Sequence, residues 1–319
     1  MRNPAGLIFL SRYLTMNPYP KRILTIPQQL QTYTDAGMTI SSVDEATAAL
    51  TTVGYYRLRG YSFHLYDNAS KQYRPGTDFS DILKLYHFDT ELSRLLFSMA
   101  TCIEVALRAR LSDAMLTYND ALILTDSAVF SDKKLFWQNI SSLSSQIARS
   151  NDVFIRHNFQ NHDGEIPLWA AVEIMSFGTL SKTIKNLKTG RNSAYTVLAG
   201  YYRYLSPHGK LVKPSLQMLS SWIQSVSVLR NMCAHNSRIY NRTINTFPEL
   251  LIIDQLNPRP PHNGLYQILL AMKYLRPTDE VWENFFTDLQ NLFAKYSGFF
   301  DLNCMNFPSD WATHLTLSA

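Results

Sequence analysis

The chain has 319 residues, of which 46% are hydrophobic and 17% charged, against roughly 25% charged residues in an ordinary soluble domain. This composition excludes a disordered or low-complexity protein, because a chain of this kind buries a large core. The formal net charge of +5, averaged over the chain, is too small to indicate a nucleic-acid partner. The three cysteines lie far apart, which favours a reducing cytoplasm. No stretch approaches roughly 18 apolar residues, so we expect a soluble protein that does not span a membrane.

The N-terminal part of the chain predicts a tail followed by a small subdomain. Residues 1–24 are expected to be a tail, because Arg12 interrupts the short apolar run before it reaches the length of a signal peptide. Residues 25–76 are expected to form an N-terminal subdomain or cap that contains a short helix over Val43–Val53. Its run Tyr55–Tyr66 interleaves aromatic rings with Arg57 and Arg59, which could bind RNA. The same run could instead be the apolar seam by which the cap packs on a bundle.

Helical periodicity dominates the rest of the chain and predicts an all-α fold, a helical bundle with this cap and extra C-terminal helices. We assign residues 77–255 to the helical core and residues 256–319 to a C-terminal helical extension, which begins with the Pro-rich linker Leu256–Pro261. A bend or an end is expected at Gly178, and a loop from Ser206 to Pro214. The predicted helices cover Asp81–Tyr118, Leu135–Asn151, Leu168–Leu187, Ser215–Asn241, Gly264–Leu275 and Thr278–Tyr296.

The charge is distributed unevenly along the chain. Between Glu173 and Glu249 there is no acidic residue, whereas ten basic residues occur there: Lys182, Lys185, Lys188, Arg191, Arg203, Lys210, Lys213, Arg230, Arg238 and Arg242. A local excess of this size attracts a polyanion, and Lys182 and Lys185 are candidate RNA contacts. The alternative is a basic surface that pairs with acidic helices elsewhere in the fold.

Several common chemistries lack their minimum residues. The chain contains no phosphate-cradling glycine motif, no zinc-protease motif and no pair of cysteines at metal-ligand spacing. We therefore expect neither a cofactor nor a metal site.

The last part of the predicted helix Ser215–Asn241 carries the candidate site. On an ideal helix Asn231, His235, Arg238 and Arg242 share one polar stripe, which could also be an ordinary solvated surface. Arg230 falls on the apolar side, where an unpaired charge costs several kcal/mol. It therefore needs an acidic partner, and the candidates are Glu104 and Asp89 on the long preceding helix; Glu104 is also spaced to pair with Arg108 at i+4.

The sequence Arg230-Asn231-x-x-x-His235 resembles the R-x(4–6)-H signature of HEPN domains. Taken with four other segments, it is similar over about Gln28–Arg242 to the Abi-like proteins of bacteria, the abortive-infection family related to phage defence. The four segments are Tyr55–Tyr61, Tyr86–Leu92, Ile103–Arg108 and Glu173–Ser181.

The resemblance implies an all-helical HEPN bundle that is often dimeric. It also implies a metal-independent endoribonuclease in active members and association with a small structured RNA in some systems. His235 would then act as general acid or base, Arg230 would stabilise charge on the phosphate, and Asn231 would orient the imidazole. Arg238 and Arg242 would hold flanking phosphates, and Glu104 would be the supporting acid.

Arg230 and His235 point about 140° apart on an ideal helix, so a site shared by two subunits of a homodimer is the favoured arrangement. The resulting hypothesis is an RNA-cleaving effector of phage defence or of a toxin–antitoxin system. The alternatives are a catalytically silent protein that binds a structured non-coding RNA, and a module that contacts only proteins.

Overall fold

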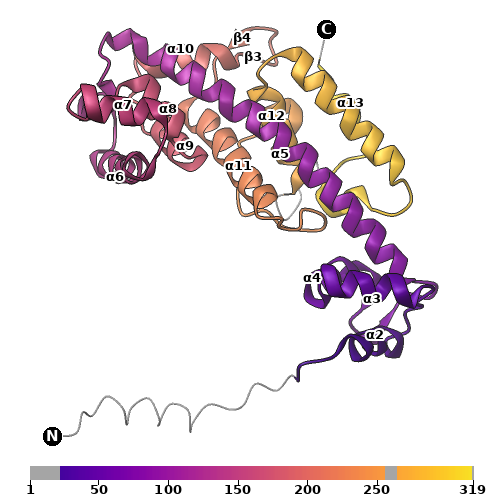
Figure 1. The fold of residues 1–319 in the computed structure, drawn as a ribbon. Helices are drawn as coiled ribbons and strands as arrows, with labels where there is room; N and C mark the ends of the chain where they lie inside the picture. The colour runs from indigo at the N-terminus through magenta and orange to yellow at the C-terminus, as the bar shows by residue number, and fades with distance from the viewer. Residues whose placement is uncertain (1–21, 256–263, 318–319) are drawn as a thin grey trace, which may run out of the picture. The chain divides into compact units, whose positions relative to one another are not determined.

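The computed structural model describes residues 22–255 and 264–317 of the chain and confirms the all-α fold (Figure 1). The predicted tail lies largely, and the predicted linker Leu256–Pro261 entirely, outside the described residues. The chain forms two compact units, Met1–Leu83 and Lys84–Ala319. In the described ranges the strands are confined to two hairpins of two-residue strands.

In its described residues, 22–83, the first unit contains three short helices and a small hairpin around one tyrosine. Tyr33 is 1% exposed, and its ring contacts the rings of Tyr55, Tyr73 and Phe79 at centroid distances of 5.3 to 6.1 Å. Burial raises the pKa of its hydroxyl well above the ordinary value. The elements are α2 (Ile26–Asp35), α3 (Val43–Thr52), α4 (Tyr55–Ser62), η1 (Phe63–Leu65), β1 (Tyr66–Asp67) and β2 (Gln72–Tyr73).

The second unit contains the remaining helices, and the long helix α5 (Phe79–Met115) enters it from the first unit. The shorter 3₁₀ segments are η2 (Leu116–Tyr118), η3 (Ile123–Thr125), η4 (Ser127–Val129), η5 (Ala199–Tyr202), η6 (Ile252–Asp254) and η7 (Leu302–Met305). The other elements are α6 (Lys133–Arg149), α7 (Val153–Asn161), α8 (Leu168–Ile174), α9 (Phe177–Lys185), α10 (Ala194–Leu198), β3 (Tyr204–Leu205), β4 (Leu211–Val212), α11 (Leu216–Ala234), α12 (Leu265–Leu275), α13 (Asp279–Lys295) and α14 (Trp311–Leu315).

Helix α5 confirms the helix predicted over Asp81–Tyr118, and the apolar residues that recur every three or four positions along it are buried. Every residue of the stripe in the second unit is 2% exposed or less: Leu85, Leu92, Leu96, Met99, Ile103, Leu107 and Leu111. Phe88 adds to this face, because its ring stacks on Phe300 at 4.2 Å and contacts Tyr240 and Phe293. The helix therefore buries one continuous face, and Phe88 on that face contacts aromatic rings from the segment after α11 and from the C-terminal part of the chain.

Helix α11 lies between α9 and α12 in the second unit. The indole of Trp222 on α11 is 1% exposed and stacks on the ring of Tyr274 from α12 at 5.2 Å. Its N–H donates to the carbonyl of Glu249. Most of α12 is buried, so the C-terminal helices complete the core around α11.

Two of the predicted helix boundaries are wrong. The expected helix Leu168–Leu187 is two helices, and the break falls at Met175 and Ser176, before Gly178. Ser176 causes the break because it has extended backbone angles and its hydroxyl accepts from the N–H of Thr179 in the first turn of α9. The expected loop Ser206–Pro214 contains the strand β4, which pairs antiparallel with β3 just before the loop. The second wrong boundary is the end of α11, which lies earlier than predicted and is described with the candidate site.

None of the helices in the described ranges combines the length and the apolar character needed to cross a membrane.

Candidate functional site

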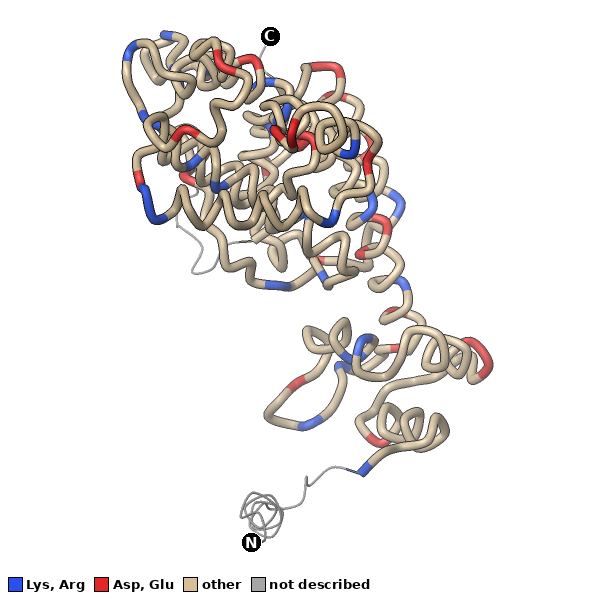
Figure 2. The backbone as a smooth tube through the Cα atoms, turned by 60° about the vertical axis from the view of Figure 1, so that its left-hand side comes forward, with Lys and Arg blue, Asp and Glu red and all other residues tan. Residues whose placement is uncertain are grey.

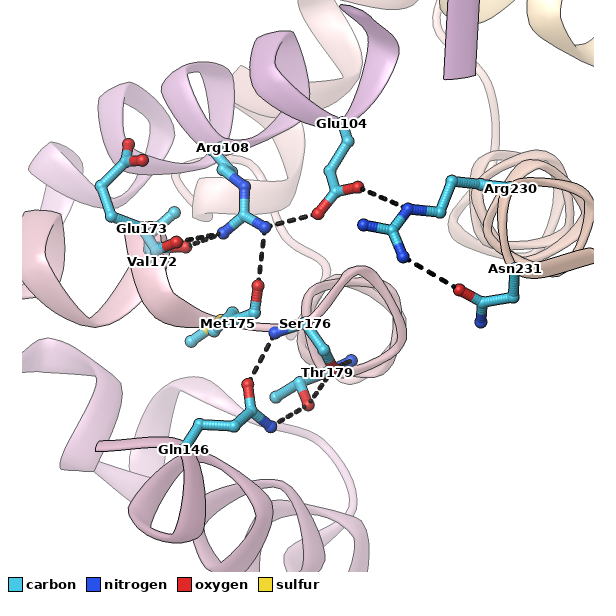
Figure 3. Close-up of polar contacts among 10 residues, drawn as sticks. All are labelled: Glu104, Arg108, Gln146, Val172, Glu173, Met175, Ser176, Thr179, Arg230 and Asn231. Carbon is cyan, nitrogen blue, oxygen red and sulfur yellow. Dashed lines mark hydrogen bonds and ion pairs between the residues drawn. The ribbon is translucent and has the colours of Figure 1, made fainter. Parts of the chain in front are cut away.

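A buried carboxylate on α5 lies between two guanidinium groups (Figure 3). Glu104 is 5% exposed, and its Oε1 accepts from Arg108, one helical turn further on, at 2.5 Å. Its Oε2 lies 3.4 Å from Nε of Arg230 on α11. Two arginines thus share one carboxylate, and the three groups together keep one positive charge. Such a group favours an anionic ligand at its open side.

Arg108 closes the end of helix α8. Its guanidinium donates to the carbonyl groups of Val172, Glu173 and Met175, with distances of 2.9 Å to Glu173 and 2.6 Å to Met175. The last carbonyls of a helix have no partner inside the helix and carry the negative end of its dipole. The arginine satisfies both needs, and Figure 3 shows it pointing into the turn between α8 and α9. Arg108 is therefore fully used by the fold.

Arg230 is held more loosely than Arg108. Its side chain is 33% exposed, against 12% for Arg108. It lies over the ring of Phe97 at 5.6 Å, and its Nη1 donates to Oδ1 of Asn231 at 3.3 Å. The structure thus pairs Arg230 with Glu104, one of its two expected partners. The exposed part of its guanidinium is available to oxygen atoms of a ligand.

The turn after α8 is fixed from a third helix. Gln146 on α6 accepts from the N–H of Ser176 at 2.6 Å, and its amide nitrogen donates to Oγ1 of Thr179 at 2.9 Å. Because Met175 binds Arg108 and Ser176 binds Gln146, this turn connects α6 and α9 to the arginine pair (Figure 3). Helices α5, α6, α8, α9 and α11 therefore all contribute to the position of the shared carboxylate and its neighbours.

Helix α11 ends at Ala234, seven residues before the predicted end at Asn241. His235 is the C-cap, and Asn236 has a left-handed backbone with φ of 50°. The N–H groups of Asn236 and Ser237 return to the carbonyls of Cys233 and Met232, which is the hydrogen-bond pattern of a Schellman motif. Asparagine adopts this conformation more readily than most residues. The expected stripe that extends to Arg238 and Arg242 is therefore wrong.

Asp89 on α5 holds the segment that follows. Its carboxylate is 2% exposed and accepts from the N–H of Ile239 at 3.0 and 3.2 Å and from that of Tyr240 at 2.6 Å. Asp89, the second expected partner of Arg230, is thus used for the backbone after α11. This contact fixes where the chain turns after His235.

The structure brings some of the predicted site residues together and separates others. Glu104, Arg230 and Asn231 form one cluster, and His235 lies exposed at the end of the same helix. Arg238 and Arg242 lie in the segment beyond the helix, and Lys182 and Lys185 are exposed on α9.

Arg57 and Arg59 belong to the first unit. Arg57 is exposed, whereas Arg59 is half-buried and donates to the hydroxyl of Tyr55 at 2.6 Å. Arg59 is thus already engaged within its own unit.

Sequence reasoning missed the roles of Gln146 and Ser176, and it saw Arg108 only as a partner of Glu104. The spacing of Glu104 and Arg108 was the available signal for that pair. No local pattern marks Gln146, because its two partners lie 30 and 33 residues away.

The site offers acid–base and anion-binding groups in place of metal ligands. In the part of the chain that the structure describes, no three His, Cys, Asp or Glu side chains gather as a metal site would require. Cys233, next to the site on α11, is buried, and burial raises the pKa of its thiol to about 11. A thiol of this kind stays protonated at neutral pH and is a poor nucleophile.

A comparison with protein families gives one match. The family model described as "Abi-like protein" matches residues 48–241, which include Glu104, Arg108, Arg230 and His235. Neither the curated proteins nor the solved structures contain a significant match to the chain.

Proposed function

Because the chain belongs to the family of Abi-like proteins, we propose that it is an abortive-infection effector that cleaves RNA without a metal ion. The reacting phosphate binds at the end of α11. Arg230 and His235 perform the chemistry, and Asn231 supports Arg230.

The proposed reaction uses the nucleophile that RNA itself carries. The 2′-hydroxyl attacks the adjacent phosphorus, the bond to the 5′-oxygen breaks, and the products carry a 2′,3′-cyclic phosphate and a 5′-hydroxyl. The enzyme must move one proton from the 2′-oxygen and supply one to the leaving oxygen. A histidine can do either step at neutral pH, and His235 is exposed to substrate. Arg230 binds the phosphate oxygens on which negative charge develops.

The shared carboxylate is the observation that carries this proposal. Glu104 forms an ion pair with Arg230 at 3.4 Å without neutralising the pair of arginines, since it also binds Arg108. Arg230 therefore keeps its charge and its direction while a third of its side chain remains open to a ligand. Preorganised cations of this kind stabilise a transition state without a cost of reorientation.

We further propose that two subunits contribute to each site. Arg230 lies inside the last turns of α11 and binds toward α5, whereas His235 lies at the C-cap, where the chain leaves the helix. The side chain of Asn231 accepts from Arg230, so Asn231 belongs with Arg230 and apart from His235. A homodimer in which the ends of two α11 helices face each other would bring an arginine of one subunit to a histidine of its partner.

A cleavage assay with the purified full chain tests the proposed activity. Cleavage of a mixed RNA substrate is expected in EDTA, and a loss of at least about 100-fold is expected in Arg230→Ala and in His235→Ala. Arg203→Ala, a change of the same type in the same acid-free segment, is the control and should keep full activity. Thermal unfolding checks that each variant is folded. Cleavage that persists in both site variants, or that requires a divalent metal ion, contradicts the proposal.

Mixing two inactive variants tests the shared site. If each site combines Arg230 of one subunit with His235 of the other, a randomly paired equimolar mixture of Arg230→Ala and His235→Ala protein should recover about a quarter of the wild-type activity. Half of the dimers are then mixed, and each mixed dimer has one intact site. An enzyme that remains a fully active monomer at every concentration contradicts this arrangement.

The acid-free basic segment favours one second candidate function, a silent protein that holds a structured non-coding RNA. Sequencing of the nucleic acid that copurifies with the protein distinguishes this candidate from the proposed RNA-cleaving effector. A discrete bound RNA together with no cleavage at any condition would favour the second candidate.

A further inference from the structure

The outer face of helix α6 has no acidic residue and carries an exposed tryptophan. From Lys133 to Asn151 the chain contains two lysines and one arginine but no aspartate or glutamate. Trp137 is 66% exposed, and its ring contacts the neighbouring Phe136 edge-on at 5.2 Å. Lys134 precedes Trp137 by three residues, so both lie on one face of the helix. An indole of this size that remains in water suggests a contact that the isolated chain does not make.

The beginning of α6 is joined to the end of α9. Asn186, which is 2% exposed, exchanges two bonds of 2.8 Å with the backbone of Asp132, and its carbonyl accepts from the N–H of Ser131. The N–H of Lys188 donates to the carbonyl of Val129. These bonds bring the start of α6, which carries Lys134, next to the segment that carries Lys185 and Lys188.

The two aspartates just before η4 and α6 bind backbone amides at the start of each helix. Asp132 accepts from the N–H of Leu135 at the start of α6, and Asp126 accepts from that of Ala128. Lys133 is also engaged, since its ammonium donates to the carbonyls of Ser127 and Phe130. In the described ranges no ion pair forms at the four other lysines, which are Lys134, Lys182, Lys185 and Lys188. We call these four lysines and Trp137 the α6–α9 surface.

We propose that the α6–α9 surface binds single-stranded nucleic acid, with a base stacked on Trp137 and phosphates on the lysines. Four cations without acidic partners match a phosphate backbone. An exposed indole offers a flat face to an unpaired base, whereas the bases of a duplex are already stacked on one another. A protein partner would bury a wider apolar area than one ring surrounded by lysines. Lys and Arg positions along the chain are marked in Figure 2.

This surface would deliver a strand to the site described above. Helix α9 has nine residues, so Lys185 lies about 13 Å along its axis from the turn at Ser176 that Arg108 and Gln146 hold. The inference rests on the proposed function in one respect, namely that the physiological strand is RNA. The binding itself does not require cleavage.

The test uses a ligand that cannot be cleaved by attack of a 2′-hydroxyl. A fluorescein-labelled 12-mer of deoxyuridine is titrated with the full-length protein, and the dissociation constant is measured by anisotropy at several salt concentrations. Trp137→Ala should weaken binding roughly 5- to 150-fold. Trp169→Ala, on α8 and 59% exposed, is the matched control and should change the constant less than about twofold.

Lysine variants test the electrostatic part. Lys134→Gln and Lys185→Gln should each reduce the slope of log K against log salt by about 0.7. The control Lys210→Gln, an exposed lysine on the β3–β4 hairpin, should leave the slope unchanged. Circular dichroism and thermal unfolding verify that all variants are folded.

The outcomes separate this inference from the proposed function. Unchanged affinity in Trp137→Ala, or equal binding of a 12-base-pair duplex, overturns the inference. A change of oligomeric state in Trp137→Ala with unchanged affinity assigns the face to a protein contact and also overturns it. If Trp137 and the lysines govern binding while the Arg230 and His235 variants cleave normally, the surface stands and the proposed active site fails.

Discussion

Glu104 holds Arg230 through Oε2, at 3.4 Å from the guanidinium Nε, while its other oxygen binds Arg108. The two arginines differ in what else they touch. Arg108 donates to three backbone carbonyls at the end of α8, whereas the outer part of Arg230 faces solvent. The same carboxylate thus serves the fold on one side and the candidate site on the other.

Glu104→Gln should lower the free energy of unfolding by about 3 kcal/mol, because it removes the charge that compensates two partly buried guanidinium groups. Urea denaturation measures this loss. Glu173→Gln is the control: its carboxylate is exposed on α8 and only its backbone carbonyl binds Arg108, so its effect should stay within about 0.5 kcal/mol. Equal losses of unfolding free energy in the two variants would show that Glu104 does not compensate the charge of the arginines.

Arg108→Ala should destabilise the protein by about 3 kcal/mol, since it leaves a buried carboxylate and several carbonyls of α8 with one partner fewer. Arg230→Ala should cost about 1 kcal/mol or less, because its side chain is a third exposed and Glu104 keeps Arg108. Cleavage should nevertheless be lost in Arg230→Ala. Arg108→Lys should not restore stability, because an ammonium cannot reproduce the planar fork. If Arg230→Ala unfolds the protein as readily as Arg108→Ala, Arg230 is a structural residue.

Asp89→Asn should loosen the segment after α11. The change removes one acceptor oxygen and the charge that binds the N–H groups of Ile239 and Tyr240, with an expected cost of about 2 kcal/mol. Hydrogen exchange should become faster at these two amides before the rest of α11 is affected. Asp113→Asn on the same helix is the control, because Asp113 is exposed and accepts only from the hydroxyl of Tyr201 at 2.6 Å. Unchanged protection of Ile239 and Tyr240 would rule out this anchoring role.

Glu91 should make stability depend on pH in the acidic range. Hydrogen bonding from Lys295, at 2.7 Å, lowers the pKa of its carboxyl, and the hydroxyl of Tyr296 adds a second bond. A folded-state pKa below the unfolded value, about 4.3, stabilises the protein above that pH, and this contribution is lost as the pH falls through the folded value.

The measurement for Glu91 is the melting temperature of wild type and Glu91→Gln at neutral pH and near pH 3. The wild type should melt higher at neutral pH, and the difference should become smaller in acid. A difference of the same size at both values would mean that the charge of Glu91 has no part in it.

Local sequence information determined most of the helices, because their signals repeat within a few residues. The apolar residues of α5 recur every three or four positions, and burial of that stripe follows directly from the period. The start of α13 was also readable, since Thr278 caps the helix and Asp279 and Glu280 follow in its first turn. The sequence also predicted that Arg230 has an acidic partner, because it falls on the apolar face of its helix.

Tertiary structure alone decided where the candidate site ends and which acid serves which group. Helix α11 stops at Ala234 because Asn236 turns left-handed, and the segment beyond it is bound by Asp89 from 150 residues away. Periodicity cannot register a contact over that separation, so the sequence extended the stripe to Arg242 and offered both Glu104 and Asp89 as partners of Arg230, with Glu104 as the supporting acid of the site. The fold assigned one carboxylate to a guanidinium and the other to backbone amides, because each buried charge must be compensated by whichever group packing brings within reach.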